Sequence, residues 1–326
     1  MIQQINWGII GCGDVTEVKS GPAFNKVPNS KLVAVMRRDA DKAADYAKRH
    51  NVPRWYSDAD KLINDPEVNA VYIATPPDSH EAYALAVIAA GKHVYVEKPM
   101  ALNYTAAKNM AQAAAAKNIK LVVAHYRREQ PLFKKIKQLL NDGAIGKPLL
   151  ARLELYKPPL TKEQLTTTHH AWRVDPAIAG GGLFNDLAPH QLDLMYYFFG
   201  PVQNINGIST NQCNNYTAVD FVAGNMLFKN GIAFSGTWCF NAAATTDHCE
   251  IVGTDGAIHF SIFSGNTITV IAKGITSHFS FDTLQHAQQP MIEKMVQYFL
   301  GNAPNPCTVD EGAEVMRMME EMVVGK

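Results

Sequence analysis

The feature that most restricts the fold is an alternation of short apolar runs with helical segments over the first 126 residues. Buried strands are predicted at 5–10, 31–38, 70–75, 94–96 and 120–126, and helices at 39–50 and 103–117. In the helix that should follow 70–75, Asp78 is expected to be the N-cap, Glu81 the capping-box partner and Gly91 the stop. Strands that alternate with helices form βαβ units around a parallel sheet, so an N-terminal doubly wound α/β domain is predicted.

The pattern changes after residue 126. An amphipathic helix is expected to end at Gly143, and the glycine run 180–182 is expected to lead into a helix that ends at Gly200. Strand-like segments then follow one another to about residue 272, and two helices close the chain at 290–300 and 310–323. Because 326 residues exceed what one core usually supports, two domains are predicted, 1–125 and 126–326, the second α+β with a large, mainly antiparallel sheet.

Charge and cysteine content exclude several classes of protein. Thirty basic residues balance thirty acidic ones, which argues against nucleic acid or a membrane surface as the main partner. No apolar run reaches membrane-spanning length, and the N-terminus lacks the basic region of a signal peptide. The five cysteines are scattered without a CxxC pair, which is typical of reduced thiols. A cytoplasmic protein is therefore expected.

The loop GIIGCGDVT places two glycines between a predicted strand and a predicted helix. Gly11 permits a tight turn, and Gly13 lets the backbone approach a pyrophosphate. The sixth position of the GxGxxG pattern is Thr16 rather than glycine, so an ordinary βα turn remains an alternative. The candidate cofactor contacts here are Gly11, Cys12, Gly13, Asp14 and Val15.

The end of the second predicted strand reads Met36-Arg37-Arg38-Asp39. In a dinucleotide fold an acid at this point favours NAD, whereas arginine accommodates the 2′-phosphate of NADP. Arg37 and Arg38 precede the acid, so NADP(H) is favoured and NAD(H) remains possible. The alternative is that both arginines are solvated and that Asp39 caps the next helix.

Two further segments carry candidate catalytic groups. In VYVEKPM, a buried strand ends on Glu97 and Lys98 directly before Pro99, where a surface ion pair is the alternative explanation. In GGGLFNDLAPHQLD, Asp186 and His190 are four residues apart and lie on one face of a helix. A histidine beside a carboxylate can transfer protons near neutral pH, although a structural histidine in a buried helix is the alternative.

Together the segments GIIGCGDV, ATPPDSH, AGKHVYVEKPM and GGGLFNDLAPHQLD resemble the glucose–fructose oxidoreductase, inositol dehydrogenase and rhizopine-catabolism family, called Gfo/Idh/MocA, over essentially the whole chain. The resemblance implies a Rossmann domain followed by an α/β domain with an open antiparallel sheet. It implies a cis peptide before Pro99, with Glu97 beside the nicotinamide ribose and Lys98 directed at the reacting oxygen. It also implies that Asp186 and His190 lie opposite the nicotinamide, with His190 as acid and base.

The resemblance implies further contacts, both within these motifs and outside them. Further cofactor contacts are expected at Thr75, Pro76, His80, Trp172 and Arg173, although His80 is equally compatible with a packing role. Substrate contacts are expected at Lys98, Tyr126, His169, Asp186 and His190. No spacing of His, Cys, Asp or Glu suggests a metal site.

The implied activity is reversible hydride transfer between a nicotinamide and the carbinol or carbonyl carbon of a sugar, sugar derivative or cyclitol. The surroundings of Arg37 and of Trp172-Arg173 resemble the branch with anhydrofructose reductase and dimeric dihydrodiol dehydrogenase. Alternatives are an NAD-dependent glycoside hydrolase of the same fold and a non-catalytic dinucleotide-binding regulator. The presence of Lys98, Asp186 and His190 together weighs against a regulator. An exposed sheet face predicts a homo-oligomer, either a dimer or a tetramer.

Overall fold

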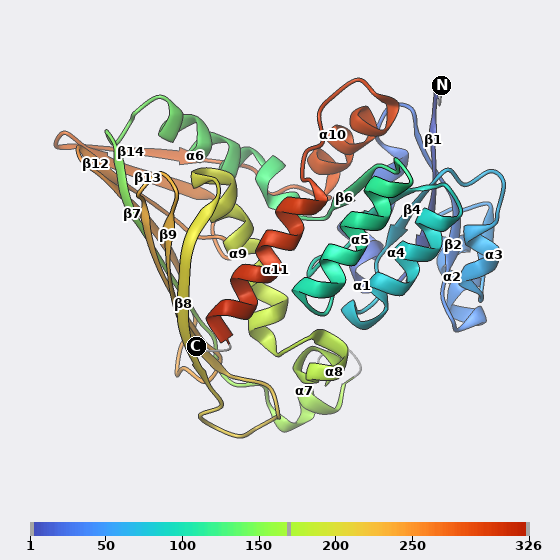
Figure 1. Cartoon of the computed structure of the whole chain (residues 1–326), viewed down its shortest axis with the longest axis horizontal. Coiled ribbons are helices and arrows are strands. Elements are labelled where there is room, and N and C mark those ends of the chain that lie inside the picture. Colours follow the sequence, from blue (N-terminus) through green and yellow to red (C-terminus); the bar gives the residue numbers. More distant parts are fainter. Residues whose placement is uncertain (1–2, 168–170, 324–326) are drawn as a thin grey trace. The chain divides into compact units, whose positions relative to one another are not determined.

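The computed structural model describes residues 3–167 and 171–323, which form two compact units (Figure 1). The first unit runs to Arg127 and also contains Leu284–Glu314, and the second contains Arg128–Thr283 and the residues from Val315 onward. The sequence-based division at 125/126 assigned everything after it to the second domain. Residues 284–314 return to the first unit because helix α10 (Gln289–Leu300) packs against its first strand.

The sheet of the first unit has six strands in the order β3-β2-β1-β4-β5-β6. All five pairings are parallel, and this order is that of a dinucleotide-binding Rossmann sheet. The predicted doubly wound domain is confirmed. The strands are β1 (Ile5–Ile10), β2 (Ser30–Met36), β3 (Arg54–Tyr56), β4 (Ala70–Ile73), β5 (His93–Val96) and β6 (Leu121–Val123).

Helices connect these strands, and α4 and α5 pack side by side (Figure 1). Asn103 caps α5, since its side chain accepts from the Ala106 amide. The predicted Asp78 cap is wrong: α4 begins at His80 with no side-chain cap, and Asp78 lies in a preceding 3₁₀ turn. The elements are α1 (Asp14–Val18), η1 (Gly21–Asn25), α2 (Ala40–Arg49), α3 (Ala59–Ile63), η2 (Pro77–Ser79), α4 (His80–Ala89) and α5 (Tyr104–Ala116).

The carboxyl ends of four adjacent strands lie in one row. Ile10 pairs with Met36 on one side and with Ile73 on the other, and Ile73 pairs with Val96. The residues that follow these positions therefore emerge along a single edge of the sheet. In an open parallel sheet this edge, at the point where the strand order reverses, is where ligands bind.

The second unit is built on an eight-stranded sheet in the order β14-β13-β12-β11-β7-β10-β9-β8. Every pairing is antiparallel except that of β10 with β7, so the predicted mainly antiparallel sheet is confirmed. The strands are β7 (Pro148–Tyr156), β8 (Val202–Thr210), β9 (Phe221–Phe228), β10 (Ala233–Cys239), β11 (Thr246–Gly253), β12 (Gly256–Phe260), β13 (Thr267–Ala272) and β14 (Ile275–Ser280).

Helices cover one face of this sheet, where alternate side chains are buried, and Figure 1 shows α6 and α9 together on it. α9 is buried along most of its length, and its N-terminal turn carries Asp186. The helical elements are η3 (Tyr126–Glu129), α6 (Pro131–Asn141), α7 (Lys162–Thr166), η4 (Ala171–Val174), α8 (Pro176–Ala179), α9 (Leu183–Phe199) and α11 (Val309–Val323), of which η3 and α11 each run from one unit into the other. None of the described helices is both long and apolar enough to span a membrane.

Candidate active site

The glycine loop has the shape that a bound pyrophosphate requires. Gly11 has a φ of +92°, and a Cβ there would lie 2.7 Å from Cγ2 of Thr75. At Gly13 a Cβ would meet only the Gly11 carbonyl, at 3.9 Å, so the space beside this backbone is open. The Thr16 hydroxyl donates to the Gly13 carbonyl at 2.8 Å, which gives the threonine at the sixth position a structural role. The loop therefore fits a dinucleotide.

Arg37 is the first residue after β2, and its Nη1 donates to the Cys12 carbonyl at 3.3 Å. The guanidinium thus lies against the glycine loop, while Arg38 is exposed. Asp39 caps α2: its carboxylate accepts from the Lys42 amide at 3.2 Å and lies 3.2 Å from the Lys42 ammonium. These hydrogen bonds lower the pKa of Asp39. Asp39 therefore has the helix-capping role that the sequence analysis gave as an alternative.

Glu97 follows β5 and is 5% exposed. Its Oε1 accepts hydrogen bonds from the Tyr72 hydroxyl at 2.5 Å and from Nε2 of Gln288 at 2.6 Å. Its Oε2 accepts from the backbone N–H of Lys98 at 3.1 Å. The Lys98–Pro99 peptide is cis, as the resemblance implied. Neither Tyr72 nor Gln288 was a sequence-based candidate.

Thr75 and His80 lie at the same edge of the first unit, where they link neighbouring loops. The Ser79 hydroxyl donates to Oγ1 of Thr75 at 2.7 Å. The imidazole of His80 is fully buried, with Nε2 2.7 Å from the Thr75 carbonyl and Nδ1 3.0 Å from the Pro99 carbonyl. Burial lowers the pKa of His80. His80 therefore joins the loop that follows β4, which includes Pro76, to the turn that follows β5, as the packing alternative expected.

In the second unit, Asp186 interacts with Arg173, and Arg173 in turn lies over the ring of Trp172. Nε of Arg173 lies 3.2 Å from Oδ2 of Asp186, and its guanidinium carbon lies 4.5 Å from the centre of the Trp172 ring. The indole and the carboxylate hold the guanidinium from two sides. Arg173 is thus placed to orient the Asp186 carboxylate.

His190 lies one turn after Asp186 on α9 and is 5% exposed. The Phe263 ring meets its imidazole edge-on, with ring centres 5.8 Å apart. Asp247 holds the Phe263 loop, since its Oδ2 accepts from the amides of Phe263 and Ser264 at 2.6 and 2.7 Å. Sequence reasoning missed both Asp247 and Phe263, because no motif or periodicity links them to α9.

Asp193 also lies on α9, three residues after His190, but it has a structural partner. Nη2 and Nε of Arg128 donate to its two carboxylate oxygens at 2.6 and 3.1 Å. The two side chains are 3% and 1% exposed. This buried two-point ion pair ties η3 to α9 and separates the role of Asp193 from that of Asp186.

Replacing Asp193 with alanine is expected to destabilise the protein by about 3–5 kcal/mol, because the Arg128 charge stays buried without its carboxylate. Urea unfolding followed by circular dichroism measures the change. The double variant Arg128→Met/Asp193→Leu removes both charges and is expected to recover most of the loss. A loss below about 1 kcal/mol, typical of an exposed pair, would contradict this account.

The remaining candidates are placed as follows. Tyr126 is 5% exposed in η3, and the Arg127 guanidinium lies over its ring at 5.8 Å. His169 lies outside the described residues.

Burial raises the pKa of the Cys12 thiol to about 11, so this cysteine is a packing group of the loop. Within 3–167 and 171–323, no cluster of three His, Cys, Asp or Glu side chains is arranged to hold a metal ion.

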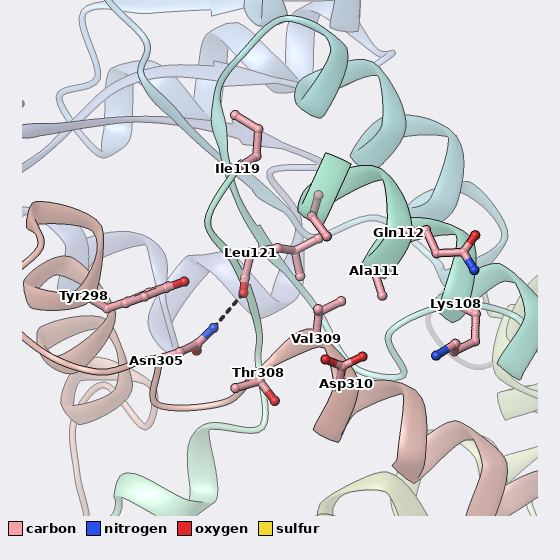
Figure 2. A pocket seen from close by; sticks show the side chains of 12 residues that line it. Lys108, Ala111, Gln112, Ile119, Leu121, Tyr298, Asn305, Thr308, Val309 and Asp310 are labelled. Atoms are coloured by element: carbon pink, nitrogen blue, oxygen red, sulfur yellow. Dashed lines mark hydrogen bonds between the residues drawn. The ribbon is translucent and has the colours of Figure 1, made fainter. Parts of the chain in front are cut away.

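A groove of about 280 Å³ lies elsewhere on the first unit, between α5 and the start of α11 (Figure 2). Its polar lining includes Lys108 and Asp310, and Nδ2 of Asn305 donates to the Leu121 carbonyl across it at 3.0 Å. None of the sequence-based candidates lines this groove. It is therefore separate from the candidate active site.

Comparisons with known proteins agree with this arrangement. Residues 5–125 match the family model described as "Oxidoreductase family, NAD-binding Rossmann fold", and residues 133–259 match the GFO/IDH/MocA C-terminal domain. A Formosa agariphila protein named as an oxidoreductase is 49% identical over 98% of each chain. The 1,5-anhydro-D-fructose reductase of Ensifer adhaerens is 27% identical over 77% of this chain and 74% of its own.

The fold is also shared with solved structures. Levoglucosan dehydrogenase, in complex with NADH and levoglucosan, superimposes with a TM-score of 0.86 and 23% identity over 98% of this chain and 96% of its own. The family models, the extended 49% identity and the Rossmann strand order lead to one conclusion. The chain belongs to the GFO/IDH/MocA family of NAD-binding oxidoreductases.

Proposed function

We propose that this oxidoreductase transfers a hydride reversibly between NADP(H) and the carbinol or carbonyl carbon of a sugar, sugar derivative or cyclitol. The observation that carries the proposal is the row of strand ends. Arg37, Gly11 and Glu97 each follow one of the paired positions Met36, Ile10 and Val96. Groups for the adenosine, the pyrophosphate and the nicotinamide thus emerge in that order along one edge.

The chain's own side chains would position the substrate and move one proton. When bound, the nicotinamide supplies a hydride to a carbonyl carbon or accepts one from a carbinol carbon. In the reducing direction, the Lys98 ammonium holds the carbonyl oxygen and stabilises the negative charge that develops on it. The His190 imidazolium gives that oxygen a proton and becomes neutral. Asp186, itself held by Arg173, orients the imidazole and favours its charged form.

The relatives support a polyhydroxy substrate. One curated relative is named 1,5-anhydro-D-fructose reductase, and the levoglucosan dehydrogenase structure holds levoglucosan. Both compounds are anhydro-sugars, so the proposed reaction centre is a C–OH or C=O carbon within a hydroxyl-rich ring. The second unit supplies one apolar ring near His190, that of Phe263, against which the C–H face of such a ring can pack.

The residues that follow β2 favour NADP(H) over NAD(H). The Asp39 carboxylate is engaged as the cap of α2. Of the two arginines that precede it, Arg38 is exposed, and Arg37 donates from Nη1 to the Cys12 carbonyl beside the glycine loop. A guanidinium binds a 2′-phosphate in two-point geometry, whereas a carboxylate that is engaged as a helix cap is less able to accept hydrogen bonds from the ribose hydroxyls of NAD(H).

Changing both arginines to alanine is expected to raise the KM for NADPH by about 10- to 100-fold, since hydrogen bonds to charged groups contribute about 1.5–3 kcal/mol. The KM for NADH should change far less, because NADH lacks the phosphate. Steady-state kinetics with both cofactors measure the difference, and NADH serves as the internal control. An equal effect on the two cofactors, or a wild-type preference for NADH, would contradict the assignment.

The function itself is tested by nicotinamide absorbance. Keto-sugars and aldoses are offered with NADPH and NADH, and polyols, inositols and aldoses with NADP⁺ and NAD⁺. Turnover on this panel, with NADPH preferred, is the expected result. If the protein binds the cofactor tightly but the nicotinamide absorbance does not change with any compound of the panel, the result would count against the proposal.

We also propose that the open face of the large sheet joins copies of the chain into a dimer or tetramer. Ile208, Leu227 and Ile271 lie on the face opposite α6 and α9, and they are 67%, 38% and 44% exposed. Exposed apolar side chains on a broad sheet face favour burial against a second copy. Light scattering that gives the mass of a monomer would refute this.

A further inference from the structure

Glu97 is the acceptor at the centre of a buried hydrogen-bond network in the first unit. Tyr72, Tyr95 and Gln288 are fully buried, and Glu97 is 5% exposed. Tyr72 and Gln288 both donate to Oε1 of Glu97, and the Tyr95 hydroxyl donates to Oε1 of Gln288 at 2.8 Å. A buried polar group is costly unless it is hydrogen-bonded, so these donors satisfy the Glu97 side chain at the end of β5.

The orientation of the Gln288 amide is fixed. A carboxylate only accepts hydrogen bonds, so the amide nitrogen must face Glu97 and the amide oxygen must face Tyr95. Nε2 also lies 3.4 Å from the Tyr72 hydroxyl, and the Tyr72 and Tyr95 rings stack with centres 4.9 Å apart. The Gln288 side chain therefore has one arrangement, which holds one oxygen of Glu97 in place.

The consequence of this network reaches Lys98. With Oε1 of Glu97 held by Gln288 and Tyr72, Oε2 is left to accept the backbone N–H of Lys98. The backbone of Gln288 is fixed separately, since its N–H donates to the Lys19 carbonyl at 3.1 Å. Nearby, Nδ1 of His286 lies 2.6 Å from the Val18 carbonyl. Residues 286–288 thus attach to the end of α1, which follows the glycine loop.

We propose that Gln288 is a positioning residue for the reaction: its side chain orients Glu97 and, through Glu97, the backbone that carries Lys98. The expected effect of Gln288 on kcat rests on the proposed function. Its effect on the backbone of Lys98 can be measured without turnover. The hydrogen bond to the Lys19 carbonyl is donated by the backbone N–H of Gln288, so a substitution by leucine or any other residue except proline keeps it. Side-chain changes should therefore affect the reaction more than cofactor binding.

The test compares Gln288→Leu with Gln289→Leu. Gln289 is the next residue, and its side chain bonds only to Glu293 on the exposed side of α10 among the contacts described for it. Gln288→Leu is expected to lower kcat by about tenfold or more, the scale of a hydrogen bond to a charged group. The Kd for NADPH should stay within about threefold, and Gln289→Leu should match the wild type in both. An unchanged kcat, or equal losses in kcat and NADPH binding, would overturn the proposal.

Amide hydrogen exchange of the cofactor-free protein gives a readout that needs no activity. In Gln288→Leu the peptide that contains Lys98 is expected to exchange faster, because Oε2 of Glu97 no longer accepts steadily from that amide. Peptides from α5 should keep their wild-type rates. Unchanged exchange at Lys98, or faster exchange throughout the first unit, would overturn the positioning role. A wild type without turnover would instead count against the proposed function, and the exchange result would still decide the role of Gln288.

If Gln288→Leu does not fold, Tyr95→Phe decides the question. It removes only the hydroxyl that holds the Gln288 oxygen, so the Lys98 peptide should exchange faster and kcat should fall by a smaller factor. Where both single variants fold, the double variant is expected to lose no more kcat than Gln288→Leu alone, because both changes act through the side-chain amide of Gln288. A Tyr95→Phe protein with wild-type kcat and exchange, or additive losses in the double variant, would overturn the proposal.

Discussion

Changing His190 to alanine is expected to lower kcat by about 10²- to 10⁴-fold, the range that general acid–base catalysis contributes. The proposed role of His190 is to exchange one proton with the substrate oxygen. Its imidazole is 5% exposed, packs against the Phe263 ring and follows Asp186 by one helical turn. Alanine cannot transfer that proton, and a solvent water in its place would not be held by these neighbours.

Steady-state kinetics across a range of pH measure this effect. The limb of the wild-type profile that reports the catalytic histidine should disappear in His190→Ala. The control is His278→Ala, which removes an exposed histidine on the edge strand β14. A His190→Ala protein with less than about a tenfold loss would show that His190 is a structural residue of α9.

Changing Lys98 to methionine is expected to lower kcat by about 10²- to 10³-fold, the scale found when one donor to a developing oxyanion is removed. Methionine keeps much of the length of the side chain but cannot donate a hydrogen bond or carry a charge. The backbone N–H of residue 98, which donates to Glu97, is unchanged in this variant, so the position of the backbone should persist. NADPH should therefore still bind.

Fluorescence titration of NADPH separates binding from turnover in this variant. Lys108→Met makes the same chemical change on α5, at the groove that lies outside the candidate site, and should leave kcat unchanged. Normal turnover by Lys98→Met would remove Lys98 from the proposed mechanism. A loss of NADPH binding as large as the loss of kcat would assign Lys98 to the cofactor instead.

Local patterns were sufficient to predict most of the long helices and strands of both units, but not the short strand β3 or the edge strand β14. The apolar runs that became β1, β2 and β4 alternate with helices, and a parallel sheet is the architecture that buries such strands on both faces. The glycine loop and the pair Asp186 and His190 were found for a similar reason, because their meaning depends on spacing within a few residues. These features lie within single βα turns or on single helix faces.

The features that sequence reasoning missed depend on contacts between distant segments. Gln288 is 191 residues from Glu97, and nothing near it in the sequence marks it as a partner of that carboxylate. Residues 284–314 read as part of the second domain because they follow its last strand, yet they belong to the first unit, where their helix α10 packs on β1. Asp78 was expected to cap α4, but the 3₁₀ turn Pro77–Ser79 moves the N-cap one residue further, to Ser79.

Hydride transfer to a sugar carbon is the central claim, and deuterium transfer tests it most directly. NADPH deuterated at both C4 positions is incubated with the wild type and the carbonyl panel, and the products are analysed by mass spectrometry and NMR. The account predicts one deuterium per product molecule, bonded to the new carbinol carbon, and one equivalent of NADP⁺. Products without deuterium, or a carbonyl panel left unreduced while NADPH binds and stays unoxidised, would contradict it.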